Sequence, residues 1–239
     1  MNKSPGEDKL PYEMLRNLSK PALKVLLDIY NCTWESGTLP GDWKHAIVAP
    51  FIKPGKDPSK PEAYRPIALT SSLCKTMERM VTNRFQWFLE RRELITKNQA
   101  GFRKNRSTVD QIIRMQDKIS KSLKGKEHVL GVFIDFEKAY DMIHVPTLMR
   151  KIRDLGVIGK MYYWVKDFLT DRTFQVKVGA TLSQKHTLEN GTPQGSVISP
   201  LLFLIMINDM PNDTSGVDLS LFVGFWYLMN SYKTSKKHH

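Results

Sequence analysis

The spacing of apolar residues predicts several helices along this chain. Apolar residues recur at every third or fourth position between Leu15 and Ile29, between Leu73 and Leu89, and after Ser107 as far as about Leu123. Ser107 is a suitable N-cap for the third of these helices. A further helix is expected from about Pro146 to Leu155.

Three shorter segments have the pattern of strands. Ala46–Ile52 is apolar and rich in β-formers, and turn residues follow it. Val129–Ile134 is almost continuously apolar, which predicts a buried central strand and places Asp135 where that strand leaves the core. Phe174–Val178 alternates with period two and is expected to be one arm of a hairpin.

The apolar runs do not predict a membrane protein. The longest run, Leu201–Ile207, is much shorter than the roughly 20 residues that cross a bilayer, so a core helix is expected there. Residues 1–9 contain no apolar segment of the kind a signal peptide requires. We therefore expect an intracellular protein, nuclear or cytoplasmic.

Composition and charge narrow the class of partner. The 36 Lys and Arg residues exceed the 24 Asp and Glu residues, giving a net charge of +12 among 239 residues. This excess favours polyanions such as nucleic acid or acidic membrane surfaces, although a merely soluble basic protein remains an alternative. Hydrophobic residues make up 41% of the chain, enough for a core. Cys32 and Cys74 suggest neither a disulfide framework nor a zinc site.

Asp135 is the first candidate for chemistry. A carboxylate at a strand end, followed by the main-chain carbonyl of Phe136, offers the hard oxygen ligands that Mg²⁺ prefers. Taken alone, an aspartate at a strand end is more often a helix cap or a surface ion-pair partner than a metal ligand. Asp141 is expected to be a cap or structural partner rather than a ligand.

Two further candidates are a loop and a basic set. Two glycines in Gly191–Ser196 would let the backbone approach a ligand, and Gln194 could hydrogen-bond a template base or sugar. The alternative is that these residues only form the loop that precedes a helix. The basic residues suit phosphate oxygens, with solvated loops as the alternative. They are Lys53, Lys56, Lys60, Arg65, Arg103, Lys104 and Arg106.

Four motifs, taken in their order along the chain, resemble those of a known family. Tyr64–Leu69, Asn98–Arg103, Phe133–Asp141 and Gly191–Pro200 together resemble the reverse transcriptase of non-LTR, LINE-like and especially jockey-like retrotransposons. The resemblance implies an α+β fold, the palm and fingers of a right-hand polymerase, with an antiparallel palm sheet packed on helices. It divides the chain into a helical lead-in (1–38), a fingers-like region (39–128), an incomplete palm (129–222) and a divergent tail (223–239), without a thumb.

The resemblance also implies roles for individual residues. Asp135 would be the catalytic metal ligand with the Phe136 carbonyl, and Tyr140 would lie under the incoming sugar and exclude a 2′-hydroxyl. The expected nucleotide-binding residues are Lys53, Arg65, Tyr140 and Gln194, and the expected template and primer contacts are Arg103, Gly195 and Ser196. The implied reaction is RNA-directed DNA synthesis from an RNA template, a DNA primer and deoxynucleoside triphosphates, with Mg²⁺ or Mn²⁺.

One departure from the family pattern bears on activity. Family members carry an aromatic-Ala-Asp-Asp hairpin after an apolar strand such as Leu219–Phe222, whereas this chain reads Val-Gly-Phe-Trp at 223–226 and has no acid from Val223 onward. Asp213 and Asp218 lie upstream. Two-metal phosphoryl transfer needs more than one carboxylate, so impaired synthesis is expected.

The sequence also allows functions other than DNA synthesis. The chain could be a catalytically inactive nucleic-acid-binding remnant of a retrotransposon polymerase, and the abrupt change after Phe222 fits decay, a frameshift or a misread frame. A membrane-surface protein is disfavoured because the Lys and Arg residues do not form one face of an amphipathic helix. The sequence leaves the oligomeric state open.

Overall fold

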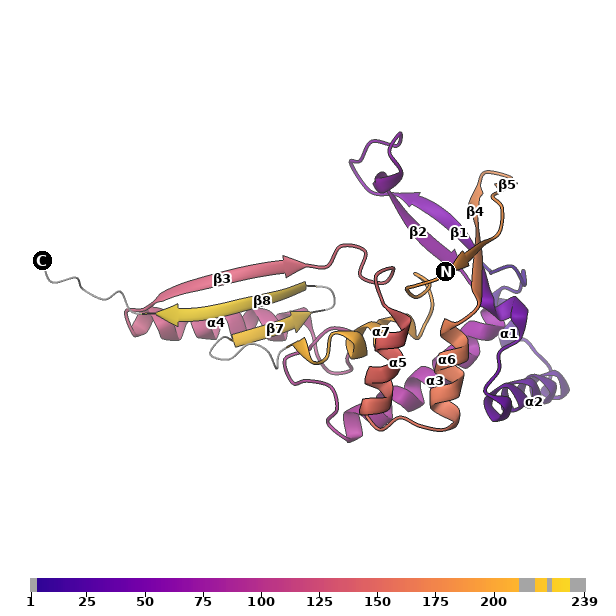
Figure 1. The fold of residues 1–239 in the computed structure, drawn as a ribbon, viewed down its shortest axis with the longest axis horizontal. Coiled ribbons are helices and arrows are strands. Elements are labelled where there is room, and N and C mark those ends of the chain that lie inside the picture. The colour runs from indigo at the N-terminus through magenta and orange to yellow at the C-terminus, as the bar shows by residue number, and fades with distance from the viewer. Residues whose placement is uncertain (1–3, 211–217, 223–224, 233–239) are drawn as a thin grey trace, which may run out of the picture. The chain divides into compact units, whose positions relative to one another are not determined.

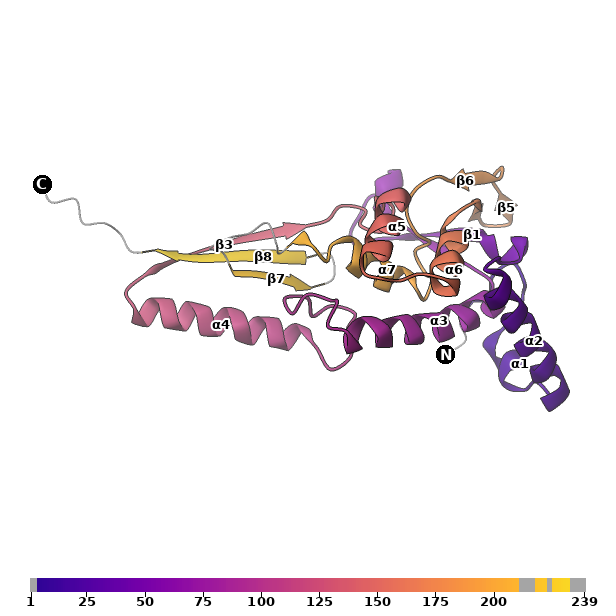
Figure 2. The same ribbon diagram turned by 60° about the horizontal axis from the view of Figure 1, so that its bottom comes forward.

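A computed structural model describes residues 4–210, 218–222 and 225–232, and the chain divides into two compact units. The first unit comprises residues 4–88 and 140–202. The second comprises residues 89–139 and the described residues from 203 onward. Figures 1 and 2 show the ribbon in two orientations.

The first unit begins with two helices rather than the single helical stretch expected from the sequence. Helix α1 spans Tyr12–Arg16 and α2 spans Lys20–Ser36. A new helix starts because the Ser19 hydroxyl accepts a hydrogen bond from the Ala22 N–H (3.4 Å) and Pro21 occupies the first turn. Gly37, with φ of +67°, ends α2 in the left-handed conformation that favours glycine.

A five-stranded sheet, ordered β2-β1-β4-β5 with β6 also paired to β4, forms the β part of this unit. Strand β1 pairs with β2 antiparallel and with β4 parallel, so this sheet is mixed. The elements are η1 (Gly41–Lys44), β1 (His45–Ile52), η2 (Pro61–Ala63), β2 (Tyr64–Leu69), β4 (Arg172–Val178), β5 (Thr181–Leu182) and β6 (His186–Leu188). The strands expected at 46–52 and 174–178 are confirmed.

Two whole helices, α5 (Val145–Asp154) and α6 (Lys160–Leu169), lie in the first unit, together with most of α3 (Ser72–Arg91) and the first turn of α7 (Ser199–Met206). Phe85, Leu148, Trp164 and Phe168 are fully buried, and the rings of Trp164 and Phe168 stack with centroids 5.5 Å apart. The sequence predicted α3, α5 and α7, but α6 was not expected.

The second unit contains a three-stranded antiparallel sheet, ordered β3-β8-β7, with α4 on one face (Figure 2). Its elements are α4 (Thr108–Lys124), β3 (His128–Asp135), β7 (Asp218–Phe222) and β8 (Phe225–Tyr232). Ser107 caps α4 as predicted, and its N–H donates to the Asp110 carboxylate at 2.6 Å.

The prediction of a buried central strand at 129–134 is wrong. Strand β3 is an edge strand of the described sheet because β8 is its one described partner, and Leu130, Val132 and Phe133 are 58%, 42% and 69% exposed. The strand nevertheless ends at Asp135, as expected. Part of the divergent tail, Phe225–Tyr232, forms β8, which suits its run of aromatic residues.

No helix among the described residues is long and apolar enough to cross a lipid bilayer.

Candidate functional site

In the first unit, the loop that begins at Gly191 rests on the turn that begins at Tyr140. The N–H of Thr192 donates to the Tyr140 carbonyl at 2.9 Å, and the N–H of Gly191 donates to the Ile143 carbonyl at 2.8 Å. Gly191 has φ of +85°, and a Cβ added there would lie 2.8 Å from the Cα of Asp141. The close approach that the glycine permits is therefore to the chain's own backbone.

Gln194 is held between this turn and strand β2. Its side-chain nitrogen donates to both carboxylate oxygens of Asp141 at 3.1 Å, and its main-chain carbonyl accepts from the Ala68 N–H at 2.7 Å. Gly195 has φ of +127°, and a Cβ there would lie 2.7 Å from the Ala68 carbonyl oxygen. Asp141 is a structural partner, as the sequence predicted, and it fixes the orientation of the Gln194 amide.

A cavity of about 360 Å³ in the first unit includes these residues in its wall. Asp141, Gln194 and Thr192 line it, together with residues of β1, β2 and β4. The Thr192 hydroxyl is buried there and has no hydrogen-bond partner among the described residues. The wall of this cavity is mainly apolar, and its polar side chains include the paired Gln194 and Asp141.

Glu78 of α3 is a site residue that the sequence reasoning missed. It is fully buried, and one of its oxygens accepts from the Ser196 hydroxyl (2.6 Å), the Val197 N–H (2.6 Å) and the Ile198 N–H (3.3 Å). The carboxylate therefore holds the end of the loop at the start of α7. Ser196, expected to contact template or primer, has its hydroxyl committed to Glu78.

Arg172 of β4 is a second buried charge near this end of the loop. Its guanidinium donates to the Phe168 carbonyl at 3.0 Å and to the Trp43 carbonyl at 3.4 Å. Burial lowers the pKa of Arg172, and the nearby carboxylate of Glu78 acts against that shift. Burial likewise raises the pKa of the Cys74 thiol, which donates to Glu78 at 3.5 Å, so Cys74 is not a reactive cysteine.

The β1–β2 hairpin carries the two cations expected to clasp a triphosphate. Lys53 directs its ammonium to the Glu62 carbonyl at 2.9 Å, within the connection between the strands. Arg65 lies opposite Phe51 in the sheet, is exposed, and makes no ion pair with any other residue the structure describes. Arg65 is therefore the more available of the two.

Tyr140 is half-buried beside Asp141. Burial raises the pKa of its phenol, so the ring is neutral over the physiological range. Its main-chain carbonyl is the acceptor for Thr192 described above, which ties the aromatic residue directly to the glutamine loop.

Arg103, in the second unit, is engaged within the protein. Its guanidinium forms a two-pronged contact with Glu90 (2.8 and 2.5 Å) and donates to the carbonyls of Thr96 (2.9 Å) and Gln99 (3.1 Å). The side chain is 7% exposed, and its hydrogen bonds lower the pKa of Glu90. Arg103 therefore stabilises its own loop and is shielded from solvent.

Asp135 lies at the end of β3 and is exposed. It is in register with Phe225, the first residue of β8, and Phe225 also pairs with Phe222, the last residue of β7. Asp218 pairs instead with Met229, level with Gly131, well along the sheet from Asp135. Asp218 is therefore no substitute, and Val223 and Gly224 lie outside the described residues.

The oxygen donors near Asp135 do not fit a two-metal centre. The described residues contain no group of three or more His, Cys, Asp or Glu side chains that could hold a metal ion. One exposed carboxylate and the main-chain carbonyl of Phe136 are too few ligands for two divalent cations. The ring of Phe136 packs edge-on against Phe203, with centroids 5.9 Å apart.

The sequence and fold place the chain in a known class. Residues 53–224 match the family described as reverse transcriptase (RNA-dependent DNA polymerase). The match ends at Gly224, where the expected aspartates are missing. The chain belongs to the reverse transcriptase family.

Similar proteins in flies refine this placement. The chain is 37% identical over 212 residues to the probable RNA-directed DNA polymerase from transposon BS of Drosophila melanogaster (88% of this chain, 23% of the relative). It is 36% identical over 214 residues to the RNA-directed DNA polymerase from mobile element jockey of the same species (90% and 23%). The chain thus spans less than a quarter of the length of these relatives, and its resemblance to jockey-like elements is confirmed.

Solved structures agree on the fold. Apo telomerase from Candida tropicalis, truncated from its C-terminal domain, superposes with a TM-score of 0.59 at 15% identity, covering 82% of this chain and 45% of the other. Telomerase from Candida albicans with a fragment of telomeric RNA gives 0.55 at 13% identity (89% and 43%). The predicted mixed α+β fold is confirmed at this level.

Proposed function

We propose that this chain is the palm-and-fingers part of an RNA-directed DNA polymerase in which DNA synthesis is impaired. The observation that carries the proposal is the alignment of Asp135, Phe225 and Phe222 across three strands. By the family pattern, the hairpin between β7 and β8 supplies the second set of carboxylates, and here it has none.

We assign residues 39–128, with β1, β2, α3 and α4, to the fingers-like region and residues 129–222, with β3 to β7, to the incomplete palm, and no described element to a thumb. Arg65 and Lys53 are the proposed triphosphate contacts, since an exposed guanidinium and an ammonium suit phosphate oxygens. Tyr140 is the proposed neighbour of the incoming sugar, and Gln194 the proposed contact of the nascent pair, because Asp141 and Ala68 fix its position.

The proposed template contacts involve other atoms of Gly195, Ser196 and Arg103 than a free side chain would offer. Gly195 and Ser196 act through main-chain atoms and loop shape, since the Ser196 hydroxyl is bound by Glu78. Arg103 is proposed to act as a positioning residue that holds its loop against Glu90. The proposed partners are an RNA template, a DNA primer and deoxynucleoside triphosphates, inside the cell in the nucleus or cytoplasm.

Mg²⁺ or Mn²⁺ is the proposed cofactor of the family reaction. In this chain the proposed metal ligands are the carboxylate of Asp135 and the main-chain carbonyl of Phe136. The shortage of further donors is the physical reason for impaired synthesis, since losing metal ligands removes several kcal/mol of transition-state stabilisation, or a rate factor of about 10² or more.

A second candidate function is nucleic-acid binding without synthesis. The net charge of +12 and the intact glutamine loop favour it, because both support binding and neither requires a metal. The two functions differ in whether Asp135 contributes to any nucleotide transfer.

Primer extension on an RNA template with Mg²⁺ or Mn²⁺ tests the proposal, with Asp135→Ala as the matched control. Weak extension that disappears in Asp135→Ala supports an impaired polymerase. Equal signal from both proteins, with retained template binding, leaves the binding function. Rapid extension by the unmodified chain contradicts the proposed impairment.

A further inference from the structure

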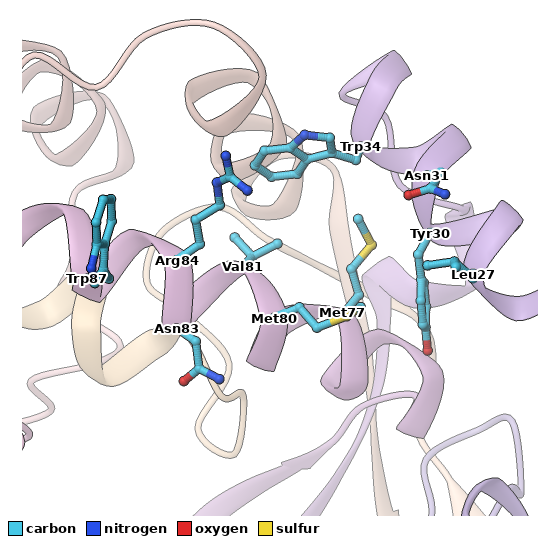
Figure 3. A pocket seen from close by; sticks show the side chains of 10 residues that line it. All are labelled: Leu27, Tyr30, Asn31, Trp34, Met77, Met80, Val81, Asn83, Arg84 and Trp87. Atoms are coloured by element: carbon cyan, nitrogen blue, oxygen red, sulfur yellow. The ribbon is translucent and has the colours of Figure 1, made fainter. Parts of the chain in front are cut away.

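A pocket of about 420 Å³ in the second unit is lined by two arginines. Arg106 belongs to the loop before α4, and Arg114 belongs to the second turn of that helix. By contrast, the larger pocket between α2 and α3 in the first unit, of about 810 Å³, is mainly apolar, and Arg84 is the only cation among its described lining residues (Figure 3). Two guanidinium groups at one pocket indicate an anionic ligand.

The period of α4 gathers polar side chains on the side of the helix that borders this pocket. Residues at three- and four-residue spacing lie on one side of a helix, and here they are Ser107, Asp110, Gln111 and Arg114. Helical side chains lean toward the N-terminus of their helix, which brings Arg114 toward the loop that carries Arg106. Two different elements thus supply the cations of one pocket.

Neither arginine forms an ion pair with an acidic side chain in the described part of the chain. Arg106 donates to the Lys97 carbonyl at 3.0 Å, which holds its guanidinium in place and leaves the charge uncompensated. Arg114 is exposed and has no hydrogen bond or ion pair with any described residue. The positive charge at the pocket is therefore available to a ligand.

Asp110 is the acidic residue among those that line the pocket, and its carboxylate is used at the start of α4. It accepts from the Ser107 N–H at 2.6 Å and from the Ser107 hydroxyl at 3.1 Å. These contacts form the capping box of the helix. The carboxylate therefore stabilises the helix start and leaves both guanidinium groups without a salt bridge.

The charges around Arg106 leave an excess of positive potential. Burial lowers the pKa of Arg106, and the charges of Arg103 and Arg114 lower it further. Glu90 and Asp110 act against this shift, but each less strongly than either arginine. A bound anion would relieve this repulsion between like charges.

We propose that Arg106 and Arg114 together bind one backbone phosphate of a nucleic-acid strand at this pocket. The inference rests on the proposed function, which supplies the strand and selects it over an acidic peptide. The forked donors of a guanidinium match phosphate oxygens, and phosphate contacts position a strand without reading its bases. Arg103 does not make this contact, because its donors are used by Glu90 and by main-chain carbonyls.

The test is the binding of the whole chain to fluorescent oligouridylate and oligoadenylate, measured by fluorescence anisotropy at several salt concentrations. Arg106→Gln and Arg114→Gln should each raise the dissociation constant by about 5-fold or more at about 0.1 M salt. The factor should be the same for both oligonucleotides, because the contact is to phosphate. The double variant should reduce the slope of log K against log salt by about 0.7, the share of one phosphate in a single strand.

Lys124→Gln is the matched control, because it removes one charge at an exposed position of the same helix that does not line the pocket. It should change the affinity by less than about 2-fold, since exposed charges away from the contact are screened by salt. Thermal unfolding separates binding from folding. Arg114→Gln should leave the melting temperature unchanged or raise it, because it removes a repulsion and no described contact.

Unchanged affinity in both arginine variants, or an equal loss in Lys124→Gln, overturns the inference and leaves the proposed function intact. A loss confined to one of the two oligonucleotides also overturns it, since that loss indicates a base contact. Binding of a deoxynucleoside triphosphate that Arg114→Gln abolishes would assign the pocket to the nucleotide instead. If the unmodified chain binds neither oligonucleotide, the proposed function itself is contradicted, and this inference with it.

Discussion

Asp135, the last residue of β3, lies opposite Phe225, the first residue of β8, in the antiparallel sheet of the second unit. Phe225 also pairs with Phe222 of β7, so Asp135 lies level with the end of the β7–β8 hairpin. The register of the three strands therefore brings the end of β3 level with the end of β7 and the start of β8. What differs from the family pattern is the chemistry of the hairpin residues.

Asp135→Asn should leave the protein as stable as the unmodified chain. The carboxylate is exposed and pairs with no residue that the structure describes, so the free energy of unfolding should change by less than about 0.5 kcal/mol. Urea unfolding followed by circular dichroism measures this. A loss of several kcal/mol would mean that Asp135 is a structural residue, contrary to its proposed role.

Glu78→Ala should strongly destabilise the loop at the start of α7. The N–H groups of Val197 and Ile198 would lose their acceptor, and each buried donor left unpaired costs about 1–3 kcal/mol. Ser196→Ala is the matched control, because it removes one hydrogen bond to the same carboxylate at a cost of about 1 kcal/mol. Equal losses in the two variants, measured by urea unfolding, would show that the cap on α7 contributes nothing.

Gly191→Ala should destabilise the chain more than Gly179→Ala. Both glycines have positive φ, +85° and +60°, but a Cβ at Gly191 would lie 2.8 Å from the backbone of Asp141, whereas nothing lies within 4 Å at Gly179. The backbone strain alone costs about 1 kcal/mol, and the clash adds about 1–3 kcal/mol. Thermal unfolding compares the two variants, and similar losses would contradict the tight contact between loop and turn.

Arg103→Ala should make the free energy of unfolding depend less steeply on pH at acid pH. The hydrogen bonds from Arg103 hold the pKa of Glu90 below its ordinary value of 4.5, so the unfolded chain takes up this proton first as the pH falls. The Glu90 contribution is fully present above pH 4.5 and is lost as the pH drops through the folded-state pKa. Urea unfolding at a series of pH values should show a shallower fall in the variant.

The control for that experiment is Lys121→Ala. Lys121 pairs with Asp117 at 2.6 Å on the exposed side of α4, and such surface pairs contribute little. The free energy of unfolding of Lys121→Ala should fall at acid pH as steeply as that of the unmodified chain. If Arg103→Ala and Lys121→Ala give the same curve, Glu90 does not depend on Arg103.

Local patterns in the sequence were enough to predict much of the secondary structure. Apolar spacing located α3, the Ser107 cap located the start of α4, and the apolar run before Asp135 located the end of β3. These features depend on residues within a few positions of each other. The break between α1 and α2 was also encoded locally, by Ser19 and Pro21, and was overlooked.

Long-range relationships could not be predicted in the same way. The parallel pairing of β1 with β4 joins segments more than a hundred residues apart in the sequence, and no local pattern specifies it. The exposure of β3 depends on which strands flank it, and an apolar run alone cannot reveal that. Strand β8 was treated as a divergent tail because its motif was missing, although its β-forming residues were visible.

The contacts of the candidate site residues were harder to predict. Asp141 was expected to be a cap or structural partner, and the hydrogen bonds that it accepts from Gln194 agree with the second of these. Glu78 was missed, although an acidic residue on the apolar face formed by Cys74, Met77 and Val81 was a usable signal, because a buried carboxylate needs donors around it. The sequence could not show that Arg103 would use its donors on Glu90.

The most direct test of the central claim is to supply the missing carboxylates with the double substitution Gly224→Asp and Phe225→Asp, and to measure primer extension on an RNA template with Mg²⁺. If the hairpin chemistry limits synthesis, the rate should rise by about 100-fold or more, and adding Asp135→Ala should abolish the gain. An unmodified chain that extends primers as fast as the double variant, or a gain that survives Asp135→Ala, would contradict it.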